Sequence, residues 1–212
     1  MTSLASAAQN ASVGEGPKLQ LEWSWRTWGG RIYDHAGPTV SLYTMEAPPG
    51  GKSLLFKTAS DDMIIGRGIL HSISSINADY ELHGRQGVVQ ALGRLKMTYS
   101  SLSNAYSEDG STPMTMTWTS TAGLKKFDVI CLDDKQLPVA RVSCDIWARK
   151  DFASIDFMGA KANDPAVRDE VIVVGITLLF TMVSRTMNPL KLAGSVFSKV
   201  GPIEPKDGPA TS

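Results

Sequence analysis

Between residues 18 and 158 the chain repeatedly alternates apolar and polar side chains. Over residues 19–26 every second residue is Leu or Trp, and Gln, Glu, Ser and Arg occupy the positions between them. This is the period-two pattern of a strand with one buried face, and residues 114–120 and 127–131 repeat it. Turns rich in Gly, Pro, Asp and Ser separate such runs about every 8–15 residues, so we expect about ten to twelve strands in an antiparallel sandwich or barrel.

One segment near the C-terminal end breaks this pattern. Asp164-Pro165 is typical of a helix start, with the Asp as cap and the proline at the first helical position. Residues 171–183 then contain no charge, and Arg185 follows them. Asp169 and Glu170 lie early enough in the expected helix to favour the positive end of its dipole.

Three interpretations compete for residues 171–183. A membrane span needs about 20 apolar residues, and charges on both sides prevent an easy extension. The abundance of β-branched residues favours a strand, although such a strand would be long. A helix that is apolar on nearly every side must instead be enclosed by protein, and Thr177 and Thr181 can bond to backbone carbonyls within it.

A helix with no polar face cannot lie on a single sheet, because its outer side would meet water. A closed barrel of eleven or more strands has room for a central helix, whereas eight strands are filled by their own side chains. We therefore predict a mainly β fold, an antiparallel barrel of about twelve strands that encloses a hydrophobic helix near the C-terminus.

The remaining segments are predicted to be tails. Residues 1–17 are small and polar and form an expected disordered leader. Residues 18–187 form the barrel, with the helix at 165–187. Glycine and proline interrupt residues 188–212, which are expected to be a mostly disordered tail.

Composition and charge exclude several classes of protein. The chain has 212 residues, 21 basic and 21 acidic, so no global field attracts nucleic acid, and no nucleic-acid partner is expected. It has 42% hydrophobic residues, enough for an ordinary core. The chain has two cysteines and no apolar run near its N-terminus, which predicts a cytoplasmic protein with reduced thiols. Peripheral binding to a membrane is compatible with this location.

Motifs for catalysis or cofactor binding are weak. A phosphate-binding loop around Gly51-Lys52-Ser53 would need a glycine where the chain has Glu46. Gly66-Arg67-Gly68 lacks the third glycine of a dinucleotide fingerprint, and we interpret it as a strand bulge or bend. The three histidines and two cysteines are scattered, so we expect no metal, no cofactor and no enzymatic activity.

Four stretches together resemble the tubby C-terminal-like superfamily, in particular its scramblase and LURP-one-related branch. They are MTWTST at 116–121, KF at 126–127, LPVARV at 137–142 and DEVIVVGITLL at 169–179. The chain looks closest to small fungal proteins of that type, over about residues 18–187. The resemblance implies a twelve-stranded barrel around a near-C-terminal helix, and in some tubby domains the exterior binds phosphoinositides.

Basic residues near expected strand ends are candidates for lipid-phosphate contacts. If these strand ends are adjacent, their basic side chains form a rim that can bind lipid phosphate, here called the basic rim: Lys125, Lys126, Arg149 and Lys150. The sequence also has three tryptophans close together, Trp23, Trp25 and Trp28. We expect alternate ones to be buried in the core and one to remain on the surface as an anchor. We therefore predict a non-enzymatic tubby-like module that binds anionic membrane phospholipids or a protein partner, without a transmembrane span.

Two other hypotheses belong to different classes. The first is a scramblase-like, membrane-associated protein that handles lipids and uses residues 171–183 as an anchor. The proline-rich segment and calcium-binding element associated with scramblases are not visible in the sequence. The second is an enzyme with a site in the mouth of the barrel, involving His71 or His83.

The enclosed helix makes a direct prediction for Phe180→Asp. A lone carboxylate inside the barrel has no partner, so the substitution should cost several kcal/mol and prevent folding. Soluble expression and the melting temperature measure this effect. Near-normal values of both would contradict an enclosed helix.

Overall fold

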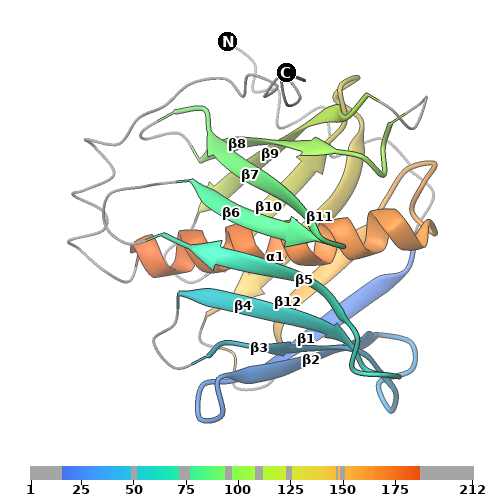
Figure 1. Cartoon of the computed structure of the whole chain (residues 1–212), viewed down its shortest axis with the longest axis vertical. Coiled ribbons are helices and arrows are strands. Elements are labelled where there is room, and N and C mark those ends of the chain that lie inside the picture. Colours follow the sequence, from blue (N-terminus) through green and yellow to red (C-terminus); the bar gives the residue numbers. More distant parts are fainter. Residues whose placement is uncertain are drawn as a thin grey trace, which may run out of the picture.

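The structure, a computed structural model, describes residues 16–48, 52–71, 77–93, 97–107, 112–122, 126–146, 148 and 151–186. Within these residues twelve strands form a closed antiparallel barrel in which each strand pairs with its neighbours along the chain. One helix, α1 (Pro165–Thr186), runs through the barrel (Figure 1). The predicted fold class is confirmed.

The strands are short and follow one another with brief connections. Their bounds are β1 (Lys18–Ser24), β2 (Gly29–Asp34), β3 (Ser41–Glu46), β4 (Ser53–Thr58), β5 (Ile64–Leu70), β6 (Ala78–Leu82), β7 (Arg85–Ala91), β8 (Thr98–Ser103), β9 (Met114–Ala122), β10 (Lys126–Leu132), β11 (Pro138–Asp145) and β12 (Asp151–Phe157). The barrel closes where β1 pairs with β12, with Leu21 opposite Ala153. Gly16 and Pro17 extend this pairing, because their backbone groups bond to both sides of Phe157.

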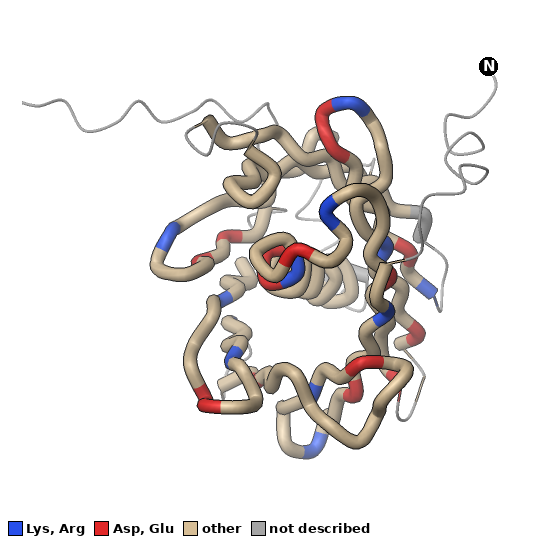
Figure 2. The backbone as a smooth tube through the Cα atoms, turned by 90° about the vertical axis from the view of Figure 1, so that its right-hand side faces the viewer, with Lys and Arg blue, Asp and Glu red and all other residues tan. Residues whose placement is uncertain are grey.

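The helix is enclosed, as its composition predicts. Every residue from 171 to 183 is buried. The view in Figure 2 shows the helix inside the ring of strands, with charged residues at its near end and on the outer turns. Within the described part of the chain, no helix combines the length and apolar character that crossing a membrane requires.

Polar groups on the helix are satisfied locally. The Asp164 side chain accepts a hydrogen bond from the Ala166 amide at 2.9 Å, which caps the helix start. Inside the barrel, the Thr177 hydroxyl donates to the Val173 carbonyl at 2.6 Å, and the Thr181 hydroxyl donates to the Thr177 carbonyl at 2.8 Å. These bonds within the helix let two threonines lie in an apolar interior.

The helix packs closest against β5 and β6, and two glycines of β5 make this approach possible. A Cβ atom at Gly68 would lie 2.0 Å from the Thr177 Oγ1 atom, and one at Gly66 would lie 2.9 Å from a Val173 methyl carbon. The pairing of β4 with β5 also shifts register here, from Gly66 opposite Phe56 to Ile64 opposite Lys57, as the prediction of a bulge or bend at these glycines requires. These glycines are needed because the helix backbone passes close to the strand.

The even number of strands fixes which turns share an end of the barrel. β12 ends beside the start of α1, so the helix runs back through the barrel to the opposite end. The turns after β2, β6 and β10 therefore surround the start of the helix. The turn from β1 to β2 lies at the end where the helix finishes (Figure 1).

The close approach of helix and strand predicts the effect of Gly68→Ala. Its methyl group would overlap Thr177, so we expect a loss of about 1–3 kcal/mol in the free energy of unfolding, as for other overpacked cores. Urea unfolding measures this loss. Thr177→Ala in the same chain should restore part of it, and Gly37→Ala, where a Cβ meets nothing within 4 Å, should cost little. Equal stability of Gly68→Ala and the unmodified chain would contradict the packing.

Candidate functional site

The turn between β1 and β2 carries large apolar side chains into solvent. Its residues are Trp25, Arg26, Thr27 and Trp28. Trp25 is 43% exposed and Trp28 is 50% exposed, although tryptophan is usually well buried. The turn lies at the end of the barrel where α1 finishes, beside Phe180 of the helix.

Five aromatic rings connect this turn to the core. The Trp25 centroid lies 5.8 Å from each of the Trp23, Trp28 and Phe152 ring centroids, and these three pairs meet edge to face. Phe180 of the helix contacts Trp23 at 5.1 Å and Phe152 at 5.5 Å. Aromatic pairs in such arrangements stabilise each other beyond their buried area. The exposed tryptophans are thus supported by a rigid cluster.

Trp28 has an unusual backbone conformation. Its φ angle is +52°, in the left-handed region that a bulky residue rarely adopts. A glycine or asparagine at this position would be less strained. Strain of this kind persists where the surrounding structure and a function maintain it, so Trp28 is a candidate functional residue.

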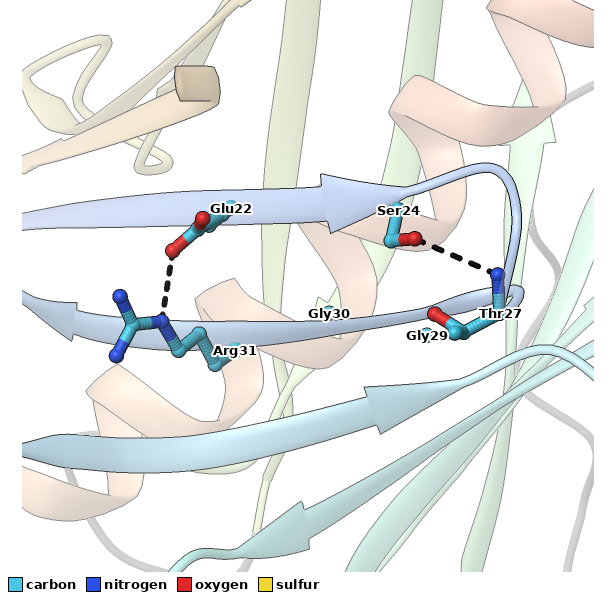
Figure 3. A pocket seen from close by; sticks show the side chains of 6 residues that line it. All are labelled: Glu22, Ser24, Thr27, Gly29, Gly30 and Arg31. Atoms are coloured by element: carbon cyan, nitrogen blue, oxygen red, sulfur yellow. Dashed lines mark hydrogen bonds and ion pairs between the residues drawn. The ribbon is translucent and has the colours of Figure 1, made fainter. Parts of the chain in front are cut away.

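A shallow, open groove of about 300 Å³ lies on the same two-stranded ribbon (Figure 3). Glu22 and Arg31 face each other on one side, and the Glu22 Oε2 atom accepts a hydrogen bond from Arg31 Nε at 2.7 Å. Toward the turn, the Ser24 hydroxyl accepts a hydrogen bond from the Thr27 amide at 3.4 Å. Gly29 and Gly30 complete the lining.

The basic rim predicted from sequence falls mainly outside the described residues. This applies to Lys125, Arg149 and Lys150. Lys126 is exposed at the start of β10, where it lies opposite Asp145 of β11. The rim as a lipid-phosphate site therefore stays a prediction.

At the opposite end of the barrel, one helix carboxylate bridges two strands. Asp169 accepts a hydrogen bond from the Tyr43 hydroxyl at 2.8 Å and lies 3.0 Å from His83 Nε2. Burial and the neighbouring Asp169 charge raise the pKa of Tyr43, while the Arg168 guanidinium opposes this shift. The phenol is therefore a neutral donor that fixes the helix to β3.

Glu170 is buried beside Asp169 and stabilises the end of β8. Its carboxylate accepts hydrogen bonds from Ser103 and from the backbone amides of Asn104 and Ala105. Burial nevertheless raises its pKa above the ordinary value, because desolvation outweighs these bonds and the charge of Lys161. Neither acidic residue lies in the first turn of the helix, so the prediction that they stabilise the helix through its dipole is wrong. Their hydrogen bonds to neighbouring strands explain why carboxyl groups occupy these two positions.

The other candidate residues do not converge on a catalytic group. His71 pairs with Asp79 at 2.9 Å at the end of the barrel opposite to His83. Cys131 and Cys144 are free and buried, and burial raises the pKa of Cys144 to about 12, which keeps this thiol protonated. Among the described residues no group of three His, Cys, Asp or Glu side chains could hold a metal ion.

The sequence predicted one of the three tryptophans as a surface anchor, whereas two of them, Trp25 and Trp28, are half-exposed. Alternation predicts that Trp23 and Trp25 share one face, and both do contact the aromatic cluster. Ser24 and Gly29 form the last pair between β1 and β2. The turn extends beyond this pair, and its two tryptophans are therefore exposed. The groove was not predicted, because Glu22 lies beside Arg31 and Gly30 only through the register of β1 and β2.

Comparisons with known proteins give little beyond this geometry. No protein family model matches the sequence, and no curated protein matches it. An X-ray structure of a protein from Arabidopsis thaliana is similar with a TM-score of 0.43 and 9% sequence identity. The similarity covers 82% of this chain and 94% of that one.

The buried carboxyl of Glu170 predicts a pH dependence of stability. Its pKa is raised in the folded state, so folding retains a proton that the unfolded chain releases above about pH 4.3. The stability of the unmodified chain relative to Glu170→Gln should fall as pH rises from about 4, and level off above the folded-state pKa. Urea unfolding of both chains between pH 4 and 8 measures this difference.

The outer-face substitution Glu81→Gln serves as the control. It replaces an outward-facing, partly exposed carboxyl of β6, so it controls for the loss of one carboxyl group that is not buried. A difference for Glu170→Gln that stays constant with pH would show that Glu170 is not a desolvated carboxyl.

Proposed function

We propose that this protein is a non-enzymatic binding module of the tubby-like barrel type, and that it binds phospholipid membrane surfaces through the β1–β2 turn. The observation that carries the proposal is the pair of half-exposed tryptophans, Trp25 and Trp28, held on a rigid aromatic cluster. The order of twelve strands followed by an enclosed helix supports the tubby-like assignment.

Tryptophan suits the boundary between lipid and water. Its ring is apolar while its indole N–H remains a hydrogen-bond donor, so it is enriched at the level of lipid headgroups. Here the Trp25 ring is already ordered by contacts with Phe152 and Phe180, and the Trp28 ring packs on Trp25, which lowers the entropy lost on binding. Arg26 lies between them in the turn and can contact lipid phosphate.

Anionic lipids would strengthen this binding through basic residues. Each Lys or Arg near an anionic surface contributes about 1 kcal/mol, and this contribution is screened by salt. Arg26 supplies one such charge at the turn, and the predicted rim of Lys125, Lys126, Arg149 and Lys150 would supply more. Insertion of tryptophan depends on apolar area and persists at high salt.

The two other hypotheses receive less support. A scramblase-like protein anchored by residues 171–183 would have to expose to lipid the helix that fills the barrel, and the core would be lost. An enzyme would need a pocket around His71 or His83. Both histidines instead pair with an aspartate on or near the surface, Asp79 and Asp169 respectively.

Vesicle flotation with Trp28→Gly tests the proposal. The purified full chain should float with phospholipid vesicles that contain an anionic lipid, and it should keep part of this binding in high salt. Trp28→Gly should lose most of the flotation, because half of the exposed aromatic surface is removed. Its melting temperature should stay equal or rise slightly, since glycine tolerates the positive φ angle.

Val40→Ser is the matched control. Val40 is 65% exposed, but it lies at the opposite end of the barrel, so its replacement should leave flotation unchanged. Equal flotation of Trp28→Gly and the unmodified chain would contradict a role for the turn. Flotation that disappears entirely in salt and in Lys125→Glu/Lys126→Glu would assign binding to the basic rim. The absence of flotation in every condition would favour a protein partner.

A further inference from the structure

We infer that the groove behind the β1–β2 turn is a binding site for a zwitterionic lipid headgroup, one that joins a phosphate diester to an ammonium group. The inference rests on the proposed function, because it assigns the headgroup that the membrane-facing ribbon recognises. Three features carry it: an open floor, a pair of opposite charges and two hydroxyl groups.

The floor of the groove is open because no side chain covers it. Gly29 lies opposite Ser24 on β1 and Glu46 on β3, on the outward face of the ribbon. A Cβ atom there would approach only the Met45 carbonyl at 3.4 Å, and Thr27 Oγ1 would lie 3.9 Å away. The side chain missing at Gly29 therefore creates space on the surface without a defect in the core.

The charges in the groove are balanced and partly exposed. Glu22 and Arg31 form an ion pair at 2.7 Å, with side chains 26% and 45% exposed. A lone phosphate would meet the carboxylate as well as the guanidinium, and a lone cation would meet the guanidinium as well as the carboxylate. A ligand that carries both signs can satisfy both groups, so charge complementarity selects a zwitterion.

Hydroxyl groups complete the match. The Ser24 hydroxyl accepts from the Thr27 amide and keeps its own proton for a phosphate oxygen. Thr27 points back over the groove (Figure 3). The Glu22 carboxylate is the group in the lining that can receive the ammonium.

Amide chemical shifts test the groove without a membrane. The probe is glycerophosphocholine, the headgroup of phosphatidylcholine without its acyl chains, added to the full-length protein. We expect shifts at the Thr27, Gly29 and Gly30 amides, and much smaller ones with inorganic phosphate alone or choline alone. Arg31→Gln should weaken binding roughly tenfold, the loss expected for one charge-assisted hydrogen bond.

Gly29→Val tests the groove by filling its floor. The new side chain should abolish glycerophosphocholine binding and reduce flotation on phosphatidylcholine vesicles, while the melting temperature stays near its original value. Gln86→Val, which adds the same side chain at an exposed position on β7, is the matched control and should bind normally. Comparison with phosphatidylglycerol vesicles measures the preference for a zwitterion.

The outcomes separate the two proposals. If vesicles float, but glycerophosphocholine shifts no amides and Gly29→Val floats normally, the groove inference is overturned and the proposed function stands. If no vesicle floats, the proposed function is overturned, and any remaining glycerophosphocholine binding would identify a soluble ligand instead. Stronger shifts with a neutral sugar such as methyl glucoside than with glycerophosphocholine would also overturn the headgroup assignment.

Discussion

The fold depends on the need to remove an entirely apolar helix from water. Residues 171–183 have no face that could be exposed without a large loss of hydrophobic free energy. A sheet can cover one side of a helix, whereas a closed barrel covers all sides and leaves no unpaired strand edge. The pairing of β1 with β12 therefore serves two purposes: it shields the helix from water on all sides, and it leaves no strand edge unpaired.

This constraint determines where function can be located. The inward faces of the strands are used to contact the helix, so their side chains cannot also line a large ligand cavity. Gly66 and Gly68 show how tight the contact is, since even a methyl group would overlap the helix. Ligand contacts are then expected on the outer surface and on the turns at the two ends, which is where the groove and the tryptophans lie.

The two ends of the barrel differ because the helix has different chemistry at each end. At its start, Asp169 and Glu170 bond to Tyr43, His83 and the end of β8, so their charges are held by a fixed polar network. Toward its finish, Phe180 presents an apolar ring, which contacts Trp23 and the Trp25 of the β1–β2 turn. The same helix thus produces a polar end that stabilises the fold and an aromatic end that is available for binding.

Periodicity and the absence of charge over residues 171–183 are local properties of the chain, so the strands, the helix and the enclosure of the helix could be predicted from them. The tertiary structure decided what each position contacts. A register shift between β4 and β5 lies beside Gly66, as the glycine pattern predicts, but only the path of the helix shows that Gly66 and Gly68 admit Val173 and Thr177. The pairing of Glu22 with Arg31 depends on the register of β1 and β2, and the exposure of Trp25 and Trp28 depends on where that register ends. The glycines of β5 and the helix residues they contact are distant in sequence, and the register of the β1–β2 hairpin is set by backbone pairing, so the side-chain pattern alone specifies neither.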